Sequence, residues 1–299
     1  MDSIVIEMVG KRHGSTSALR DISLEIGRGE VFGIFGRAGV GKTSLIRLIA
    51  GLDHASVGSL FFQSTTEGDQ SWLRARTAAA LQKPGLAPEL TVNENLLLAS
   101  SLWSNPRKGR TGRIAMFTEL LGLTDVRARR AGALSDGMKA AAEIARALVA
   151  RAEITLIDGL IERLDRPTRR RLWEHIKVSK RRGATFIIAT TSADDAELCD
   201  RLAVLSRGSL AFIGGPEELR SVALNETVVV ESIQNPLLKS KLKGRFGAAI
   251  TERNGSLEFT TRSAETDAAK ILTELHSDVG CVYVRQSTLD DALDRIEGG

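Results

Sequence analysis

A glycine-rich stretch between a predicted strand and a predicted helix carries the residues best suited to phosphate chemistry. Gly36, Gly41, Lys42 and Thr43 follow the spacing G-x-x-x-x-G-K-[ST] within VFGIFGRAGVGKTSLIRLIAGL at 31–52. Such a loop turns its backbone N–H groups inward as a nest for phosphate oxygens, and the helix that follows points its positive end there. The lysine reaches the β- and γ-phosphates and the threonine hydroxyl holds Mg²⁺. We therefore predict a site for Mg²⁺ and a nucleoside triphosphate, formed by Gly36, Arg37, Ala38, Gly39, Val40, Gly41, Lys42, Thr43 and Ser44.

The composition of the chain indicates a globular protein of the cytoplasm. Of its 299 residues, 42% are hydrophobic and 26% are charged, which is typical of such proteins. The sequence contains no apolar run long enough for a membrane span and no secretory signal, and its two cysteines, Cys199 and Cys281, predict ordinary reduced thiols. A net charge of +4 permits an anionic partner. Because only 4% of the residues are aromatic, base stacking has little support and we expect no nucleic acid partner.

Strands and helices alternate through the first two thirds of the chain, which predicts a layered α/β domain with a largely parallel sheet. We expect strands at 4–9, 22–26, 31–35, 58–63, 78–82, 154–158, 185–190, 201–206 and 209–213. Helical patterns occupy much of the stretch between 91 and 150, then 167–181 and 193–199. The expected order after residue 222 is strand 227–233, helix 235–243, strands 247–252 and 256–261, helix 265–276 and strand 279–285. This order predicts a small ferredoxin-like α+β domain.

Beyond the phosphate loop, several motifs resemble those of the ATP-binding subunits of ABC transporters, in the branch that pairs with export permeases. The resemblance covers most of 1–221, and the ending STLDDALDRIEGG resembles the C-terminal extension of that branch. It implies a P-loop NTPase domain of ABC type over 1–222, with a mixed sheet and a helical subdomain at about 88–150, followed by an accessory domain over 223–299. It also implies ATP and Mg²⁺ as cofactors, and a dimer that drives an integral membrane permease from the inner face of the cell membrane.

The same resemblance assigns roles to residues outside the phosphate loop. Gln82 matches the glutamine that contacts Mg²⁺ or the attacking water, and Asp158 closes the second nucleotide motif, so Thr43, Gln82 and Asp158 are the expected Mg²⁺ ligands. His13 occupies the position of a ring that stacks on adenine, although it also fits an exposed turn. Asp165 lies in the loop that crosses the dimer interface, although it also suits a helix cap before proline. The signature LSGGQ, which faces the nucleotide of the partner subunit, is matched by Leu134, Ser135, Asp136, Gly137 and Met138.

Three departures from the family pattern predict impaired hydrolysis. The family segment D-E-P-T-S-G-L-D aligns without gaps on 158–165, so Gly159 stands where the catalytic glutamate should be. Thr191 stands in place of the switch histidine, and Asp136 replaces a glycine of the signature. A positioned acid or base contributes roughly 10²–10⁴ in rate. We therefore expect a subunit that binds Mg·ATP and cleaves it slowly, as a homodimer or, better, as the weak half of a heterodimer with an intact ABC ATPase subunit.

Other interpretations stay open at this stage. Glu162 is a candidate substitute for the missing base, but a loop would have to rearrange to bring it there. The basic run at 163–182 is either a solvated helix face or a contact for phospholipid or for an acidic permease loop. An ABC ATPase acting on ribosomes or DNA is disfavoured because the sequence has one nucleotide-binding motif and no long coiled coil. A nucleotide-gated regulatory scaffold that is not a transporter subunit is the remaining alternative.

Overall fold

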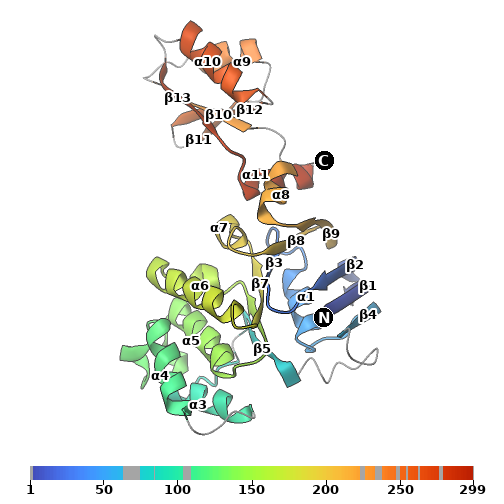
Figure 1. Ribbon diagram of the computed structural model, residues 1–299, viewed down its shortest axis with the longest axis vertical. Helices are drawn as coiled ribbons and strands as arrows, with labels where there is room; N and C mark the ends of the chain where they lie inside the picture. Colours follow the sequence, from blue (N-terminus) through green and yellow to red (C-terminus); the bar gives the residue numbers. More distant parts are fainter. Residues whose placement is uncertain are drawn as a thin grey trace. The chain divides into compact units, whose positions relative to one another are not determined.

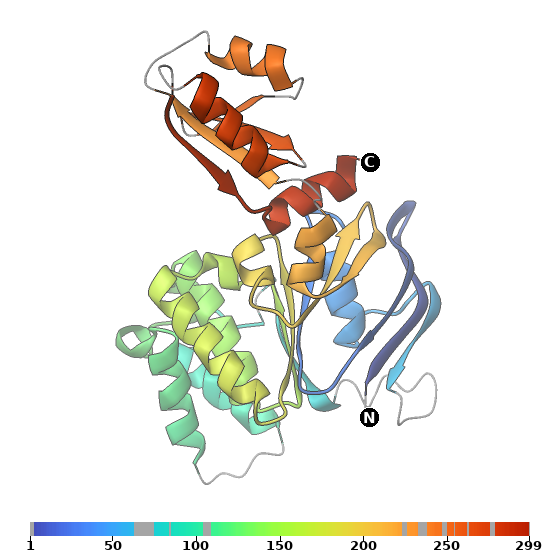
Figure 2. The ribbon, with the colours of Figure 1, turned by 45° about the horizontal axis from the view of Figure 1, so that its top comes forward.

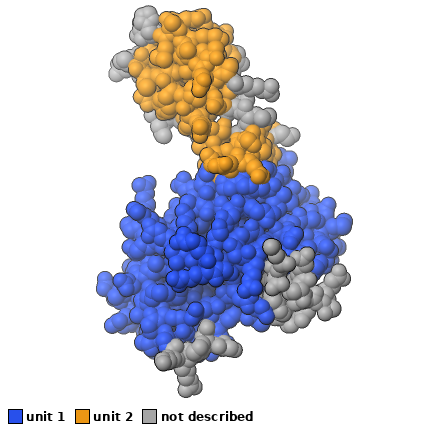
Figure 3. All heavy atoms as spheres, viewed as in Figure 1, with its two compact units in different colours: residues 1–216 blue, residues 217–299 orange. Residues whose placement is uncertain are grey.

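The computed structural model describes residues 3–62, 75–83, 85–103, 109–222, 226–232, 238–246, 250–253, 255–261, 263–275 and 279–298. Parts of the expected helix at 235–243 and strand at 247–252 therefore lie outside the described residues. The chain divides into two compact units, residues 1–216 and 217–299 (Figure 3). Among the described helices, none combines the length and the apolar character that crossing a membrane requires.

A six-stranded mixed sheet forms the centre of the first unit (Figure 1). The neighbours β5–β6, β6–β7, β7–β3 and β3–β8 pair in parallel, and β8–β9 pair antiparallel. Strands β3, β6 and β7 are buried along their whole length, which fits their largely apolar sequences. The predicted layered α/β core with a mixed sheet is confirmed. In sheet order the strands are β5 (Thr77–Ala80), β6 (Ile154–Asp158), β7 (Thr185–Thr190), β3 (Val31–Phe35), β8 (Arg201–Ser206) and β9 (Ser209–Gly214).

Helix α1 (Lys42–Ile49) lies between this sheet and a second, antiparallel sheet (Figures 1 and 2). The buried apolar side chains of α1 share one cluster with residues of both sheets. Burying a large apolar side chain stabilises a fold by roughly 1.5–3 kcal/mol, so this packing holds α1 and the loop before it in place. The second sheet has the order β2 (Thr16–Ile26), β1 (Ile4–His13) and β4 (Val57–Phe62).

Helices cover the opposite face of the six-stranded sheet (Figure 2). Side-chain caps set where several of them begin: Thr91 and Glu94 form a capping box at α3, and Ser135 and Asp165 cap α5 and α6. The helix bounds are α3 (Val92–Leu102), α4 (Arg110–Leu120), α5 (Asp136–Val149), α6 (Arg166–Lys180) and α7 (Ala193–Ala196), with short 3₁₀ helices η1 (Thr124–Val126), η2 (Ala131–Ala133) and η3 (Ile161–Arg163).

The first hairpin is longer than the sequence predicts. Strands expected at 4–9 and 22–26 extend to 4–13 and 16–26, and only the Gly14–Ser15 pair remains in the turn. Register shifts within the β1–β2 pair, between Ile6 and Val9 and again further along, interrupt the alternation of apolar and polar residues. The predicted strands cover only the parts of β1 and β2 that lie away from the turn.

The second unit contains a four-stranded antiparallel sheet with helices. Its sheet order is β11-β12-β10-β13, and the elements follow the predicted β-α-β-β-α-β order along the chain. Valines of β10, together with Leu257, Phe259 and apolar residues of α9 and α10, form its core. The bounds are α8 (Pro216–Val222), β10 (Glu226–Ser232), α9 (Leu238–Phe246), β11 (Thr251–Arg253), β12 (Ser256–Thr261), α10 (Ala264–Glu274), β13 (Val279–Arg285) and α11 (Leu289–Gly298).

Candidate functional site

The phosphate loop joins the carboxyl end of β3 to the first turn of α1. Gly41 precedes the helix with φ +108°, a conformation that favours glycine, and a Cβ there would lie 2.6 Å from the carbonyl oxygen of Ala18. The buried Lys42 donates to the carbonyl oxygens of Gly36 at 2.6 Å and Arg37 at 2.7 Å. The ammonium group is therefore hydrogen-bonded to the loop itself, and phosphate oxygens bound there would compete with these two carbonyl groups for its hydrogen bonds.

The three expected Mg²⁺ ligands, Thr43, Gln82 and Asp158, are joined by hydrogen bonds. The Thr43 hydroxyl donates to the Asp158 carboxylate at 2.9 and 3.1 Å, and the Gln82 amide donates to the same group at 3.4 Å. Burial raises the pKa of Asp158, and the hydrogen bonds from Thr43 and Gln82 offset only part of that effect. A buried carboxylate whose side-chain donors here are neutral is a suitable ligand for a hard divalent cation, so these residues fit Mg²⁺.

A pocket of about 410 Å³ lies at the phosphate loop and is lined by several segments of the first unit. Lys42 and Thr43 belong to the loop side, and Gln82, Gly159 and Thr191 follow strands β5, β6 and β7. Gly159 has φ +60°, and a Cβ built there would lie 2.9 Å from the Gln82 amide nitrogen. Among the described residues that line this pocket, Glu162 is the one carboxylate and none is a histidine.

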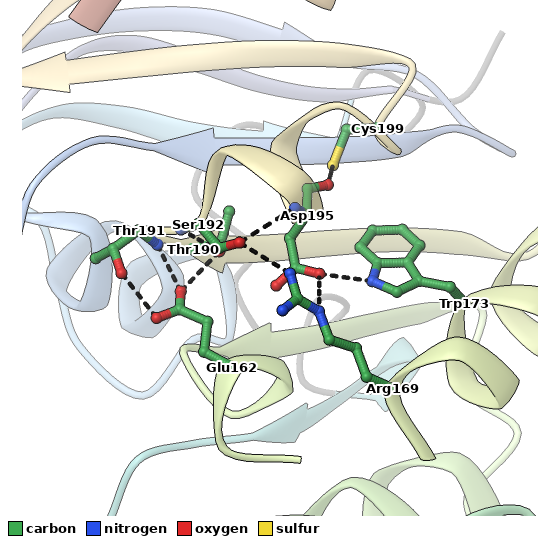
Figure 4. Close-up of polar contacts among 8 residues, drawn as sticks. All are labelled: Glu162, Arg169, Trp173, Thr190, Thr191, Ser192, Asp195 and Cys199. Carbon is green, nitrogen blue, oxygen red and sulfur yellow. Dashed lines mark hydrogen bonds and ion pairs between the residues drawn. The ribbon is translucent and has the colours of Figure 1, made fainter. Parts of the chain in front are cut away.

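Glu162 binds the last residue of β7 and the residue that follows it (Figure 4). Its Oε1 accepts from the Thr190 hydroxyl at 2.7 Å and from the Thr191 N–H at 2.6 Å. Its Oε2 accepts from the Thr191 hydroxyl at 2.7 Å. Burial raises the pKa of Glu162, but the hydrogen bonds from Thr190, Thr191 and the backbone of Ser192 outweigh it and hold the pKa below the ordinary glutamate value. Glu162 is therefore a carboxylate at neutral pH.

A second carboxylate, Asp195, fastens the same segment to α6 (Figure 4). Its Oδ1 accepts from the Arg169 guanidinium at 2.9 Å and the Trp173 indole at 2.7 Å, and the side chain is fully buried. Arg169 also donates to the Ser192 hydroxyl at 2.8 Å, and the Cys199 thiol donates to the Asp195 carbonyl oxygen. The segment 190–195 is thus held from two sides, by η3 and by α6.

Of the other predicted site residues, Ala38, Gly39 and Ser44 line the pocket, whereas several lie outside its described lining. His13 ends β1, with its Nε2 3.3 Å from the hydroxyl oxygen of Ser44 in α1. Asp165 caps α6 by accepting from the Thr168 N–H at 2.8 Å. The signature residues lie at the start of α5 and are absent from the described lining of the phosphate pocket: Leu134, Ser135, Asp136, Gly137 and Met138.

Comparisons with known proteins agree with this site. The ABC transporter family pattern matches residues 19–161. The Nod factor export ATP-binding protein I of Burkholderia orbicola is 31% identical over 281 residues, covering 84% of this chain and 92% of that protein. The chain belongs to the ABC transporter ATP-binding family.

Other members of the ABC family extend the comparison. The methionine import ATP-binding protein MetN 2 of Paraburkholderia xenovorans is 29% identical over 316 residues, covering 99% of this chain and 81% of MetN 2. A solved ATP-binding cassette of an ABC transporter, in its ADP conformation, has a TM-score of 0.60 and 26% identity, covering 73% of this chain and 92% of that one. Both import and export proteins therefore occur among the relatives of this ABC chain.

The sequence interpretation left Thr190 and Arg163 out of the site and considered Glu162 only as a substitute base. Both Thr190 and Arg163 line the pocket of this ABC chain. The pair Thr190–Thr191 directly follows an apolar run. Because ligands in α/β sheets bind at the carboxyl ends of strands, this polar pair at the end of a predicted strand could have indicated the site from the sequence. The partners of Glu162 lie 28 and 29 residues away, and no local pattern indicates such a pairing.

We predict that Asp195→Ala lowers the free energy of unfolding by about 3 kcal/mol, because it leaves Arg169 and Trp173 without their shared acceptor. Urea denaturation measures the change. The control is Glu174→Ala, which removes the exposed partner of Arg170 and should cost at most about 0.5 kcal/mol. Equal effects of the two substitutions would contradict the structural role of Asp195.

We also predict that Mg²⁺ affinity in the presence of nucleotide falls as the pH is lowered. Only ionised Asp158 can hold the metal, and because its pKa is raised, protons compete at a higher pH than for an ordinary aspartate, whose pKa is about 3.9. A Mg²⁺ titration from neutral to mildly acidic pH measures this loss. The nucleotide also titrates in this pH range, so the same titration is made on Asp158→Asn, where only the nucleotide contributes. Identical pH profiles for the variant and the unmodified chain would contradict the assignment of Asp158 as a Mg²⁺ ligand.

Proposed function

We propose that this chain is the ATP-binding subunit of an ABC-type membrane exporter, that it binds Mg·ATP, and that its own hydrolysis is weak. The composition of one pocket supports nucleotide binding with weak hydrolysis. It contains the phosphate-loop residues Lys42 and Thr43, with Asp158 hydrogen-bonded to Thr43, but Gly159 and Thr191 where the family has its glutamate and histidine. The likeness to a cassette solved in its ADP conformation supports nucleotide binding.

The residues present are suited to binding. Lys42 and the N–H groups of the loop neutralise phosphate charge, and the N-terminus of α1 adds the positive end of its dipole. Thr43 and Asp158 would hold Mg²⁺, with Gln82 beside them, and the bound ion would neutralise charge between the phosphates. His13 adjoins the same helix through Ser44 and offers a ring to the adenine.

Hydrolysis additionally needs a group that orients and polarises the attacking water. Glu162, the one carboxylate among the described lining residues, accepts three hydrogen bonds from Thr190 and Thr191, which weakens it as a base. Its low pKa has the same consequence. Gln82 can position a water but cannot take a proton from it. Weak hydrolysis follows from these side chains.

Weak hydrolysis suits one half of an asymmetric pair. The signature residues at the start of α5 are outside the described lining of their own chain's pocket, which agrees with a role toward a nucleotide held by another subunit. We propose a heterodimer with an intact ABC ATPase subunit, docked on a permease at the inner face of the membrane. The strand order of the second unit supports a ferredoxin-like accessory domain.

The purified chain should bind Mg·ATP and hydrolyse it slowly, and Lys42→Ala should abolish binding, as measured by calorimetry. Gly159→Glu combined with Thr191→His should raise turnover by up to about 10²-fold, because it restores both missing groups. The left-handed backbone at Gly159 disfavours a side chain by about 1 kcal/mol, so the same variant should unfold at a lower temperature.

Each part of this prediction has its own contrary result. Brisk turnover by the unmodified chain would show that another group activates water. Unchanged ATP affinity in Lys42→Ala would remove the phosphate-loop assignment. No gain in the double variant would mean that more than these two positions limits hydrolysis.

The transporter role predicts an integral membrane partner. The tagged chain, isolated in detergent from its own cell, should bring down a membrane protein and a second ATP-binding subunit, identified by mass spectrometry. The control is the same isolation with an unrelated tagged protein. Recovery of soluble partners alone would favour the regulatory scaffold instead.

A further inference from the structure

Glu162 accepts hydrogen bonds from three donors on one wall of the pocket. The Thr190 hydroxyl, the Thr191 hydroxyl and the Thr191 N–H all donate to this one carboxylate. Thr190, Thr191 and Glu162 line the same pocket as Lys42. Phosphate and carboxylate oxygens accept hydrogen bonds in the same way, so these donors are already paired with an anionic acceptor before any phosphate enters the pocket.

The carboxylate also adds a negative charge to the pocket. The cations in the described lining are Lys42 and Arg163, and the nearby Asp158 is the acidic group that Mg²⁺ would neutralise. Glu162, with its lowered pKa, stays charged when nucleotide arrives. A triphosphate brings more negative charge into this cavity than a diphosphate, and like charges repel each other more strongly in a partly buried site than in water.

We propose that Glu162 is a specificity-determining residue of this pocket, which weakens its hold on the terminal phosphate of a nucleoside triphosphate relative to a diphosphate. This inference rests on the proposed nucleotide binding. Glu162 acts as a built-in substitute for the terminal phosphate, because it fastens the segment 190–192 whether or not the nucleotide carries one. The pocket then binds Mg·ADP about as tightly as Mg·ATP.

The contacts of Glu162 support a role in specificity over a role as base. Its two oxygens face the segment after β7, as the dashed lines of Figure 4 show, and each accepts a short hydrogen bond from that segment. A general base needs an oxygen directed at the water and a pKa near the working pH. A fixed, ionised carboxylate is poorly suited to act as a base, but it does repel negative charge that a ligand brings into the pocket.

Dissociation constants for Mg·ATP and Mg·ADP, measured by calorimetry on the 299-residue chain, test the inference. For the unmodified chain the two constants should agree within about threefold. Glu162→Gln keeps the shape and removes the charge, so it should tighten Mg·ATP by about tenfold, equivalent to ~1.4 kcal/mol, and leave Mg·ADP unchanged. Thr191→Val keeps the charge and removes one donor, so its ATP-to-ADP ratio should stay near that of the unmodified chain.

The matched control is Glu174→Gln, the same chemical change at an exposed ion pair on α6, which should alter neither constant. If the unmodified chain binds Mg·ATP about tenfold or more tightly than Mg·ADP, that result alone overturns the inference. Equal changes for both nucleotides in Glu162→Gln also overturn it. If neither nucleotide binds, the proposed function is overturned instead. Failure of the proposed function and failure of the inference about Glu162 are therefore distinguishable.

Discussion

The parallel pairing of β6, β7 and β3 brings the residues of the site together. Neighbouring parallel strands end at the same edge of a sheet, so the phosphate loop after β3, Asp158 at the end of β6 and Thr190 at the end of β7 meet there. Thr43 and Asp158 are 115 residues apart in the sequence, yet they share a hydrogen bond. The strands keep this register because apolar layers cover both of their faces, with α1 on one side and α5 and α6 on the other.

Within that frame, three charged groups of the site are bound to the protein itself. Lys42 donates to loop carbonyl groups, Asp158 accepts from Thr43 and Gln82, and Glu162 accepts from the segment after β7. Binding of a phosphate or a metal ion is therefore an exchange of internal hydrogen bonds for bonds to the ligand. The exchange would favour a cation at Asp158, since burial opposes the negative charge of that carboxylate. It is less favourable at Glu162, where the donors already have an anionic acceptor.

The sequence predicts those parts of the structure whose signals are local. Residues 36–44 could be assigned because one continuous stretch supplies the strand, the loop and the helix. The Glu162 contacts could not, because they depend on the pairing of β6 with β7 and on the 3₁₀ turn at η3. Asp136 illustrates a different limit. As a departure from the signature, Asp136 predicts impaired hydrolysis. It also lies in the first turn of α5, where a negative charge stabilises a helix.

Gly159, at the position where the family resemblance predicts a glutamate, is fitted to its surroundings as a glycine. Its backbone is left-handed, its N–H donates to the Ala189 carbonyl oxygen at 2.9 Å, and the space a Cβ needs is taken by the Gln82 amide. Gln82 is in turn hydrogen-bonded to Asp158, so a side chain at 159 would shift the end of Gln82, a predicted Mg²⁺ ligand, as well as strain the local backbone. Once glycine occupies this position, the loop is free to adopt a conformation that other residues rarely adopt. Glu162, three residues on, is a carboxylate of the same pocket, but its oxygens are bound to Thr190 and Thr191.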